Sequence, residues 1–242
     1  MDAIVTKSLT KKYKTITAVD GLDLRIKQGE LFSLLGINGA GKTTTVKMLT
    51  CLTKPDDGDA IILGKSILKD SGEVKKHIAV APQETAVAPA LTARENLELI
   101  CGVHGFNKEK SQRKINELCS LLKLNEILDR RAAKLSGGWQ RRLSIAMALI
   151  SEPDILFLDE PTLGLDVIAR SELWEIVKAL KGKITVILTT HYMEEAEALS
   201  DRIAIMKDGR LLTCATAQEI KAATGSASFE EAFIKTVRGS KI

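Results

Sequence analysis

No uninterrupted apolar run in this 242-residue chain reaches the roughly 18 residues that a membrane-spanning helix requires. The N-terminus lacks the basic stretch followed by an apolar segment that marks a secretory signal. Internal repeats and low-complexity tracts are also absent. With 27% charged and 45% hydrophobic residues, neither a disordered chain nor a coiled coil fits the whole sequence. We therefore expect a water-soluble protein of the cytoplasm.

Cysteine is scarce, and its positions form no recognisable metal or redox site. The four cysteines contain no Cys-x-x-Cys pair and lie far apart, at Cys51, Cys101, Cys119 and Cys214. Such a site needs ligands that are clustered in the sequence or brought together by the fold. The sequence shows no such cluster, so we expect reduced and mostly buried thiols.

The net charge of +4 is small, but it is unevenly distributed. Residues 105–142 contain ten Lys and Arg against four Asp and Glu, which leaves +6 in this segment and −2 in the rest. A basic region of this kind is compatible with binding to nucleic acid or anionic lipid. A solvated helical face is the commoner explanation.

Apolar segments alternate with helical patterns, which predicts an α/β fold with a mainly parallel sheet and helices on both of its faces. The expected strands are 3–8, 22–26, 31–35, 61–63, 78–81, 155–158, 184–189 and 203–206. The expected helices are 41–52, 97–103, 108–123, 136–150, 167–180 and 193–199. Thr92 and Glu95 form a capping box at a helix start. The helical patterns within residues 84–150 predict a helical insertion into the α/β core.

Residues 36–43 match the pattern G-x-x-x-x-G-K-[ST], and they lie between an apolar strand and a helix. Glycines allow backbone amides to surround phosphate oxygens, and a helix N-terminus adds partial positive charge. Lys42 can then reach the β- and γ-phosphates of a nucleotide, and the Thr43 hydroxyl can ligate Mg²⁺. An ordinary glycine-rich turn is the competing interpretation, but the flanking strand and helix favour a phosphate loop.

A pair of acidic residues follows the apolar strand at 155–158. Asp159 at the end of the strand can hold the Mg²⁺ shell, and Glu160 can polarise an attacking water molecule. Strands that end in acidic residues are common, so this pattern is weak by itself. Together with the phosphate loop it becomes a strong indication of nucleotide hydrolysis.

A third motif, Leu-Ser-Gly-Gly-Trp-Gln at 135–140, precedes a long helical pattern. Ser136 is suited to an N-cap, and Gly137 and Gly138 leave amides available for a second anion. A capped helix after a flexible turn would explain Ser-Gly-Gly alone. Beside the other motifs, it indicates two phosphate-binding helix starts about a hundred residues apart in one chain.

These motifs, in this order, resemble those of the nucleotide-binding subunits of ABC transporters, and the likeness covers nearly the whole chain. Residues 36–43 match Walker A and 155–159 match Walker B, while 135–140 resemble the LSGGQ signature with Trp139 in place of its glutamine. The resemblance implies an α/β P-loop NTPase core with an antiparallel N-terminal β subdomain and an inserted α-helical subdomain. The implied organisation is a single ABC ATPase domain over 1–242, with a RecA-like core at 1–83 and 151–225, a helical signature subdomain at 84–150 and a short C-terminal tail helix within 226–242.

The resemblance also implies roles for single residues. Gln83 occupies the Q-loop position, His191 the position of the switch histidine, and Tyr13 the position of an aromatic ring that stacks on adenine. Simpler interpretations remain: a loop polar residue for Gln83, a core histidine for His191 and a surface aromatic for Tyr13. The implied catalytic residues are Glu160, His191 and Gln83, and the implied metal ligands are Thr43, Gln83 and Asp159. The implied nucleotide contacts are Tyr13, Asn38, Gly39, Gly41, Lys42, Thr43, Thr44, Ser136, Gly137, Gly138 and Asp166.

In this family two subunits face head to tail, and each ATP lies between Walker A of one subunit and the signature of the other. The implied cofactors are ATP and Mg²⁺. The implied partners are a second ATPase subunit, in a homodimer or a heterodimer, and a separate transmembrane permease. The resemblance therefore places the chain peripherally on the cytoplasmic side of the cell membrane, with no nucleic acid partner expected. Asp166, in the D-loop at 164–166, would cap the next helix and also cross the dimer interface.

The subfamily is indicated by two short segments. Residues 91–97 and 228–233 resemble those of exporter subunits of the drug, antibiotic, lipid and sodium type, so export is favoured. The resemblance implies that residues 83–103 form the docking groove for the permease, and the loop at 87–91 supports this because it is apolar without an obvious need. Two other classes remain open: a nucleic-acid- or ribosome-associated ABC ATPase, suggested by the basic region, and a non-hydrolysing assembly protein.

Overall fold

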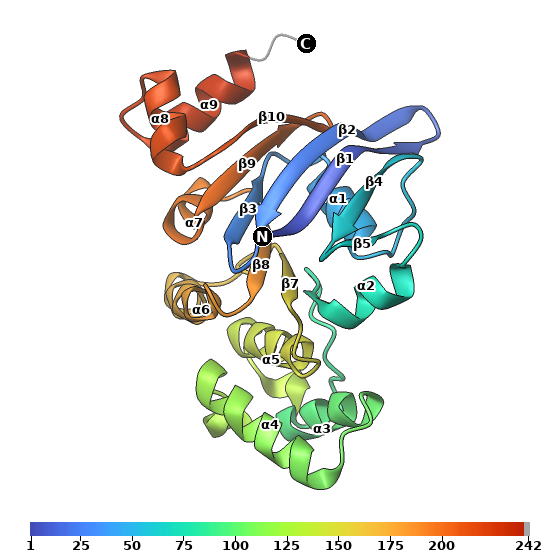
Figure 1. Cartoon of the computed structure of the whole chain (residues 1–242). Coiled ribbons are helices and arrows are strands. Elements are labelled where there is room, and N and C mark those ends of the chain that lie inside the picture. Colours follow the sequence, from blue (N-terminus) through green and yellow to red (C-terminus); the bar gives the residue numbers. More distant parts are fainter. Residues whose placement is uncertain (240–242) are drawn as a thin grey trace.

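The computed structural model describes residues 1–239, whose larger sheet has six strands in the order β10-β9-β3-β8-β7-β6 (Figure 1). Five of these strands are parallel, and β10 pairs antiparallel with β9. The strands are β3 (Leu31–Leu35), β6 (Ile78–Ala81), β7 (Ile155–Asp159), β8 (Thr185–Thr190), β9 (Arg202–Lys207) and β10 (Arg210–Ala215). Every residue of β3, β7 and β8 is buried, as expected for central parallel strands covered on both faces. The predicted mainly parallel sheet is confirmed.

A smaller sheet of four antiparallel strands has the order β2-β1-β4-β5. Its strands are β1 (Asp2–Tyr13), β2 (Ile16–Lys27), β4 (Asp57–Ile62) and β5 (Lys65–Ser66). Alternate residues of β2 are buried, which orients Leu22, Leu24 and Ile26 towards a hydrophobic core. This sheet is the antiparallel N-terminal part that the family resemblance implied.

Helices cover both faces of the large sheet (Figure 1). Helix α1 (Lys42–Leu49) packs between the two sheets, where Val46 and Met48 share a core with Phe32 of β3 and Phe157 of β7. On the opposite face α6 (Val167–Leu180) packs on Leu156 of β7 through its buried apolar side chains. The remaining helices of the core are α2 (Ser71–His77) and α7 (Met193–Leu199).

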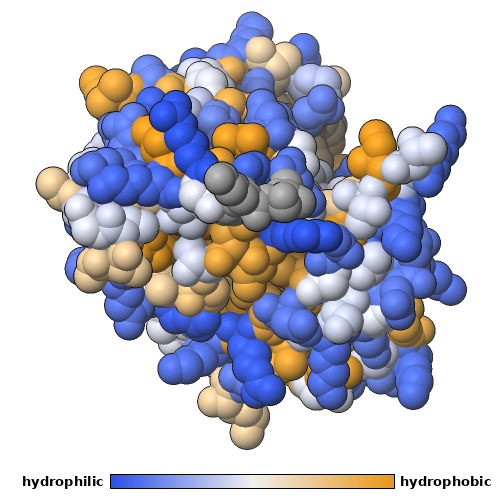
Figure 2. Space-filling view, turned by 90° about the horizontal axis from the view of Figure 1, so that it is seen from above, coloured by the Kyte–Doolittle hydropathy of each residue, from blue (hydrophilic) through white to orange (hydrophobic). Residues whose placement is uncertain are grey.

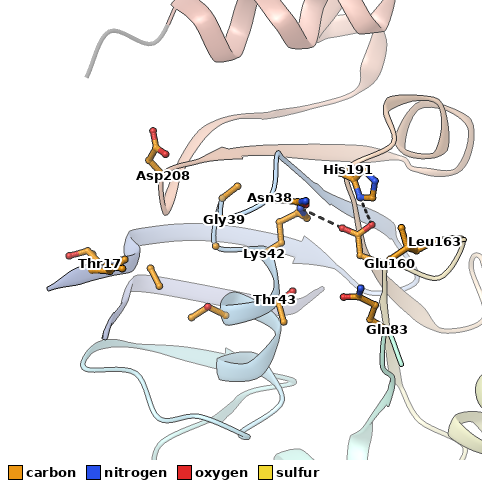
Figure 3. A pocket seen from close by; sticks show the side chains of 15 residues that line it. Thr17, Asn38, Gly39, Lys42, Thr43, Gln83, Glu160, Leu163, His191 and Asp208 are labelled. Carbon is orange, nitrogen blue, oxygen red and sulfur yellow. Dashed lines mark hydrogen bonds and ion pairs between the residues drawn. The ribbon is translucent and has the colours of Figure 1, made fainter. Parts of the chain in front are cut away.

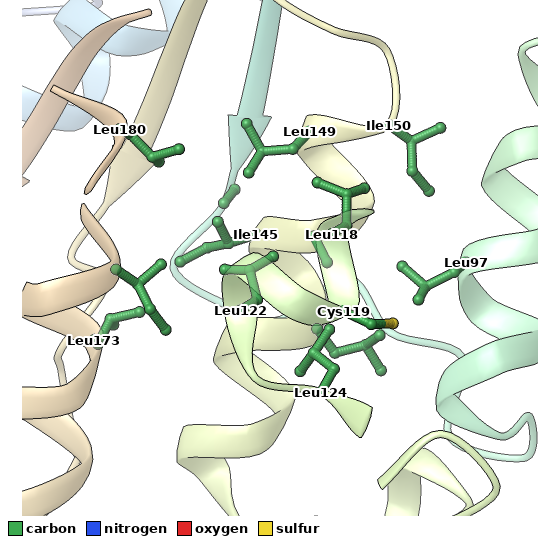
Figure 4. Close-up of a cluster of buried hydrophobic side chains, with 14 of the residues drawn as sticks. Leu97, Leu118, Cys119, Leu122, Leu124, Ile145, Leu149, Ile150, Leu173 and Leu180 are labelled. Atoms are coloured by element: carbon green, nitrogen blue, oxygen red, sulfur yellow. The ribbon is translucent and has the colours of Figure 1, made fainter. Parts of the chain in front are cut away.

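The segment between β6 and β7 is helical, with α3 (Ala93–Val103), α4 (Lys108–Leu122) and α5 (Gly137–Leu149). Apolar side chains from all three helices, including Leu97, Leu118 and Ile145, pack together in a core that continues into the large sheet and α6 (Figure 4). The predicted capping box is present, because Thr92 accepts from the amide of Glu95 and the Glu95 carboxylate accepts from that of Thr92. The predicted helical insertion is therefore observed as a compact unit below the sheet in Figure 1.

Sequence patterns missed the short elements α2, β5 and β10, and also α8 (Ala217–Thr224). Helix α2 buries only Val74, so it has almost no apolar periodicity to detect. The predicted tail helix is observed as α9 (Phe229–Gly239), which packs with α8 on β9 through Phe229 and Phe233. Residues 240–242 of the predicted tail lie outside the described residues. Seen from above, this end of the molecule is mainly hydrophilic, and hydrophobic residues gather near the centre of the view (Figure 2).

The four cysteines are free thiols, of which Cys101 and Cys119 are buried and the other two are partly buried. Burial raises the pKa of all four thiols, which makes them poor nucleophiles at neutral pH. Among residues 1–239, no helix combines the length and the apolar composition needed to cross a membrane.

Candidate active site

A pocket of about 800 Å³ opens where β3, β6, β7 and β8 end (Figure 3). The carboxyl ends of parallel strands are the usual ligand sites of open α/β sheets. The pocket is lined by Ile16, Thr17, Ala18, Asn38, Gly39, Ala40, Gly41, Lys42, Thr43, Thr44, Gln83, Glu160, Leu163, His191 and Asp208. The fold therefore brings the phosphate loop, Gln83, Glu160 and His191 together, although they are up to about 150 residues apart in sequence.

The phosphate loop has the backbone shape that its glycines predict. Gly39 and Gly41 have φ angles of 82° and 101°, in the left-handed region that glycine adopts readily. A Cβ atom on Gly41 would lie 2.5 Å from the carbonyl oxygen of Ala18, so no other residue fits there without displacing that strand. Gly41 is also the N-cap of α1, and no side chain caps the first amides of this helix. These amides are available to an anion.

Lys42 is almost completely buried beside the pocket, with 6% of its surface exposed. Its Nζ donates to the carbonyl oxygen of Gly36 at 2.7 Å and lies 3.5 Å from Glu160 Oε1. A buried ammonium group beside free helix amides and a threonine hydroxyl suits a polyphosphate chain. The residues present therefore fit the phosphates of a nucleotide.

Glu160 is held in an unusual backbone conformation at the end of β7. Its φ angle is 48°, which is uncommon for a residue with a side chain, and its amide donates to the carbonyl and hydroxyl oxygens of Thr189 at 3.1 Å. This conformation turns the carboxylate towards the pocket, where Oε2 lies 2.8 Å from His191 Nδ1 (Figure 3). Strained residues of this kind occur frequently at active sites.

His191 directly follows β8 and is partly exposed, with 31% of its side chain accessible. Because Nδ1 is engaged with Glu160, the second ring nitrogen is left for other contacts. The ring also stacks on Tyr192, with a distance of 4.1 Å between ring centroids. These two contacts fix the orientation of the imidazole.

Asp159 lies behind the pocket and does not line it. Its carboxylate accepts a hydrogen bond from the Thr189 hydroxyl, and the residue is 8% exposed. Within the described part of the chain, no group of three or more His, Cys, Asp and Glu side chains is arranged to hold a metal ion. A metal ion at Thr43 would therefore need phosphate oxygens among its ligands, as Mg²⁺ usually has in nucleotide sites.

Sequence reasoning missed Arg141, which connects the helical segment to the pocket. Its guanidinium group, on α5, donates to the carbonyl oxygens of Pro82 and Gln83, and the side chain is buried. Burial lowers the pKa of Arg141, and the charges of Asp159 and Glu195 oppose that effect. This anchor holds the backbone of Gln83 beside the pocket.

The signature residues lie at the start of α5, and Ser136, Gly137 and Gly138 are not among the residues that line the pocket. Ser136 is the N-cap, yet its side chain accepts no hydrogen bond from this helix. A Cβ atom on Gly138 would lie 3.0 Å from Cβ of Ala169, so α5 and α6 approach closely here. The chain thus has a second helix start with uncapped amides, separate from the phosphate loop.

Two further predicted residues occupy surface positions. Asp166 caps α6, because its carboxylate accepts from the amide of Ala169 at 2.9 Å. Tyr13 is 45% exposed at the end of β1 and does not line the pocket, whose lining on that side begins at Ile16. The patterns also missed Asp208, which lines the pocket from the turn between β9 and β10.

Trp139, the departure from the signature, is partly buried and packs against the core of the helical segment. The guanidinium carbon of Arg142 lies 4.5 Å from the centre of its ring, and Arg142 forms an ion pair with Glu172 of α6. The large ring therefore has packing partners in this chain, which explains how the position accommodates it.

Comparisons with known proteins agree with this geometry. The ABC transporter family matches residues 19–163. The chain is 41% identical over 225 residues to the daunorubicin/doxorubicin resistance ATP-binding protein DrrA of Streptomyces peucetius, which covers 93% of this chain and 68% of that protein. It is 37% identical over 240 residues to the probable multidrug ABC transporter ATP-binding protein YbhF of Escherichia coli, covering 97% of this chain but 41% of that protein.

Solved structures show the same fold. An ATP-binding subunit of an ABC transporter superimposes with a TM-score of 0.85 at 28% identity, over 97% of this chain and 99% of that one. The ATP-binding cassette MJ0796, in a dimeric post-hydrolysis state bound to ADP and Pi, superimposes with a TM-score of 0.78 at 30% identity, over 88% of this chain and 98% of that one.

Proposed function

The chain belongs to the ABC transporter family, as an ATP-hydrolysing subunit, and from this premise we propose that it powers export through a separate membrane permease. The observation that carries the proposal is the pocket in which Lys42, Glu160 and His191 meet beside the phosphate loop. Export is supported by similarity to DrrA, named for daunorubicin and doxorubicin resistance, and to the Nod factor export ATP-binding protein I of Burkholderia pseudomallei, which is 41% identical over 206 residues.

We assign the phosphates of ATP to backbone amides within residues 38–44, to Lys42 and to the Thr43 hydroxyl, leaving out the amide of Ala40, which donates to the carbonyl oxygen of Ile37. All of these residues line the pocket. Mg²⁺ would be held by Thr43, Gln83 and Asp159 together with phosphate oxygens. It would neutralise charge that develops on the phosphates. Asp159 does not line the pocket in this structure, and its carboxylate accepts a hydrogen bond from the Thr189 hydroxyl.

Glu160 is the proposed general base. Its carboxylate is turned into the pocket and can accept a proton from water as the water oxygen bonds to the terminal phosphorus. The bond between that phosphorus and the bridging oxygen then breaks, and ADP and phosphate are the products. His191 would hold the carboxylate through Nδ1 and contact the terminal phosphate through its second nitrogen. Lys42, now close to Glu160, would turn towards the phosphates when ATP binds, because a phosphate chain carries more charge than one carboxylate.

The second anion site supports a head-to-tail dimer. Ser136, Gly137 and Gly138 lie outside the pocket that holds Lys42, so within one chain they do not line the same site. In a dimer they would contact the ATP of the other subunit, and Asp166 at the start of α6 would lie near the same seam. The dimeric state of MJ0796 supports this arrangement. Adenine would lie beside Ile16, Thr17 and Ala18, and Tyr13 would reach it through a change in side-chain orientation.

The permease would dock on the outer face of the helical segment. Leu99 and Val103 of α3 are 50% and 74% exposed, which is unusual for large apolar side chains on one helix. Val87, in contrast, packs against the buried core, so the apolar loop at 87–91 partly serves the fold. This contact would hold the chain peripherally on the cytoplasmic side of the membrane.

The structure of the basic region at residues 105–142 supports a nucleic acid partner less than its amino-acid sequence does. Arg141 is committed to backbone carbonyls and Arg142 to Glu172, while Lys114 pairs with Glu117 and Glu152. These three cations are buried, so their charges are not displayed on a binding surface.

Two measurements test the proposal. Purified chain should release phosphate from MgATP, and chain captured from detergent-solubilised membranes should retain one membrane-spanning protein, identified by mass spectrometry. Vesicles that contain both should accumulate the transported compound only with ATP on the outer side. Absence of phosphate release, or retention of ribosomes or nucleic acid in place of a membrane protein, would refute the proposal.

A further inference from the structure

Glu195 is a fully buried carboxyl group that the proposed reaction does not use. It lies on α7, four residues after His191, and is 0% exposed. Trp174 Nε1, from α6, donates a hydrogen bond to Glu195 Oε1 at 3.2 Å. The other oxygen, Oε2, is buried without a hydrogen-bond partner among the described residues. Buried polar atoms are rarely left unpaired, because removing them from water costs free energy.

The surroundings of Glu195 come from the segments that carry the reaction. Thr190 directly precedes His191, Thr162 follows Glu160 by two residues, and both are buried at 0% and 2% exposure. The Thr162 hydroxyl oxygen is also buried without a partner. Burial raises the pKa of Glu195, and the nearby hydroxyl groups of Thr190 and Thr162 lower it to a smaller extent.

Burial favours the protonated form of Glu195, although the hydroxyl groups of Thr162 and Thr190 can donate to its carboxylate. Protonated Oε2 can donate to the Thr162 hydroxyl, while Oε1 continues to accept from Trp174. Glu195 Oε2 and the Thr162 hydroxyl oxygen, which otherwise have no partner among the described residues, are then paired with each other. Two charged groups interact electrostatically with Glu195: Arg141 on α5 and Glu160 at the end of β7.

We propose that Glu195 is a positioning residue for ATP hydrolysis, which connects the segment after Glu160 to the segment before His191. Trp174 of α6 holds the Glu195 carboxyl group in place, and the carboxyl group in turn holds Thr162 and Thr190 at a constant separation. This separation maintains the 2.8 Å contact between His191 Nδ1 and Glu160 Oε2. The inference rests on the proposed function, because it acts through two residues of the hydrolysis site.

A positioning role and a purely structural role predict different results. Loss of a structural contact would lower stability, and its effect on the rate would add to that of any other substitution. Loss of positioning lowers kcat while the affinity for MgATP stays the same, and it has no further effect once His191 has been removed.

The experiment uses the full chain with Glu195→Leu, Glu195→Gln and Trp174→Phe, each alone and combined with His191→Ala. The matched control is Glu194→Gln, because the Glu194 side chain is adjacent in sequence but 84% exposed. Steady-state phosphate release gives kcat and KM, a fluorescent ATP analogue gives the affinity, and thermal unfolding reports folding.

We expect Glu195→Leu to lower kcat by at least about tenfold with KM and affinity within about twofold of wild type. Glu195→Gln should recover most of that rate, because its amide can accept from Trp174 and donate to Thr162. Trp174→Phe, which removes the Nε1 donor together with part of the ring system, should lower kcat by about threefold or more. None of these substitutions should lower the rate further in the His191→Ala background, and the control should behave as wild type.

A kcat near that of wild type in Glu195→Leu, or a loss that adds fully to that of His191→Ala, would overturn the inference. If Glu195→Leu does not fold, Trp174→Phe decides, and an unchanged kcat in that variant overturns the inference too. Wild-type chain that fails to release phosphate would instead refute the proposed function. The two failures are therefore distinguishable.

Discussion

Lys42 Nζ lies 3.5 Å from Glu160 Oε1, and the two side chains are only 6% and 8% exposed. The cation assigned to the phosphates and the carboxylate assigned to water activation therefore neutralise each other in this structure. A buried charge without a partner is costly, and each of these two side chains supplies the other with a partner. Binding of ATP would replace the carboxylate beside Lys42 and release Glu160 towards water.

Glu160→Gln tests this relationship and the role of the carboxylate together. The amide retains the shape of the side chain but cannot act as a base, so turnover should fall by roughly 10²–10⁴-fold. MgATP should still bind, and in the absence of hydrolysis it should hold two chains together. Size-exclusion chromatography with and without MgATP checks this, with wild type as the control. An active variant that remains monomeric would show that another group is the base.

Gly41→Ala and Gly39→Ala separate steric clash from backbone strain in the phosphate loop. Both glycines have positive φ angles, so either alanine should cost about 1–2 kcal/mol of unfolding free energy. A Cβ atom on Gly41 would also meet the Ala18 carbonyl oxygen at 2.5 Å, whereas one on Gly39 meets nothing within 4 Å. Gly41→Ala should therefore be less stable by a further ~1–3 kcal/mol. Urea unfolding of both variants measures the difference, and equal stabilities would contradict the observed packing.

Replacing Leu99 and Val103 by Asp tests the docking surface on α3. Both side chains are largely exposed, so the double variant should fold and retain its own ATPase activity within about twofold. It should lose the membrane protein that co-purifies with wild type, because two carboxylates oppose burial in an apolar interface. Ile234→Asp, an exposed apolar position on α9, is the matched control. Equal recovery of the membrane protein with wild type, the double variant and Ile234→Asp would show that the docking surface lies elsewhere.

The stability of the chain should depend on pH through Glu195. Burial raises its pKa above the ordinary value of 4.5, so folding favours the protonated form. As the pH rises above about 4.5, the unfolded chain releases this proton while the folded chain retains it, and stability falls until the folded pKa is passed. Glu195→Gln cannot ionise, so its melting temperature relative to wild type should increase from pH 5 to pH 8. Glu194→Gln, which changes an exposed carboxylate, should show no such trend.

Much of the fold follows from local patterns. The buried strands β3, β7 and β8 are short apolar runs that the sequence shows directly, and α6 and α7 have the predicted bounds because their apolar periodicity is clear. Elements with little buried surface, such as α2 and β5, leave no such pattern. Their positions depend on contacts with the sheets.

The candidate site also has features that the sequence predicts and features that only the structure shows. Lys42, Thr43 and Glu160 were predicted because each lies in a contiguous motif, in which a few adjacent residues carry the chemistry. Their mutual distances were not predictable, since they depend on which strands are neighbours in the sheet. The role of Tyr13 stays a prediction, because the pocket lining begins three residues later, at Ile16.

The sequence by itself therefore determined the class of chemistry: a phosphate loop, an acidic strand end and a second anion-binding helix start. Only the tertiary structure decided which side chains contact these parts and hold them in place. It paired Lys42 with Glu160, anchored Gln83 through Arg141, and buried Glu195 between Trp174 and the two ends of the reacting segments. The physical reason is that motif chemistry is local along the chain. The pairing of buried polar groups, in contrast, is settled only when distant segments are brought together away from water.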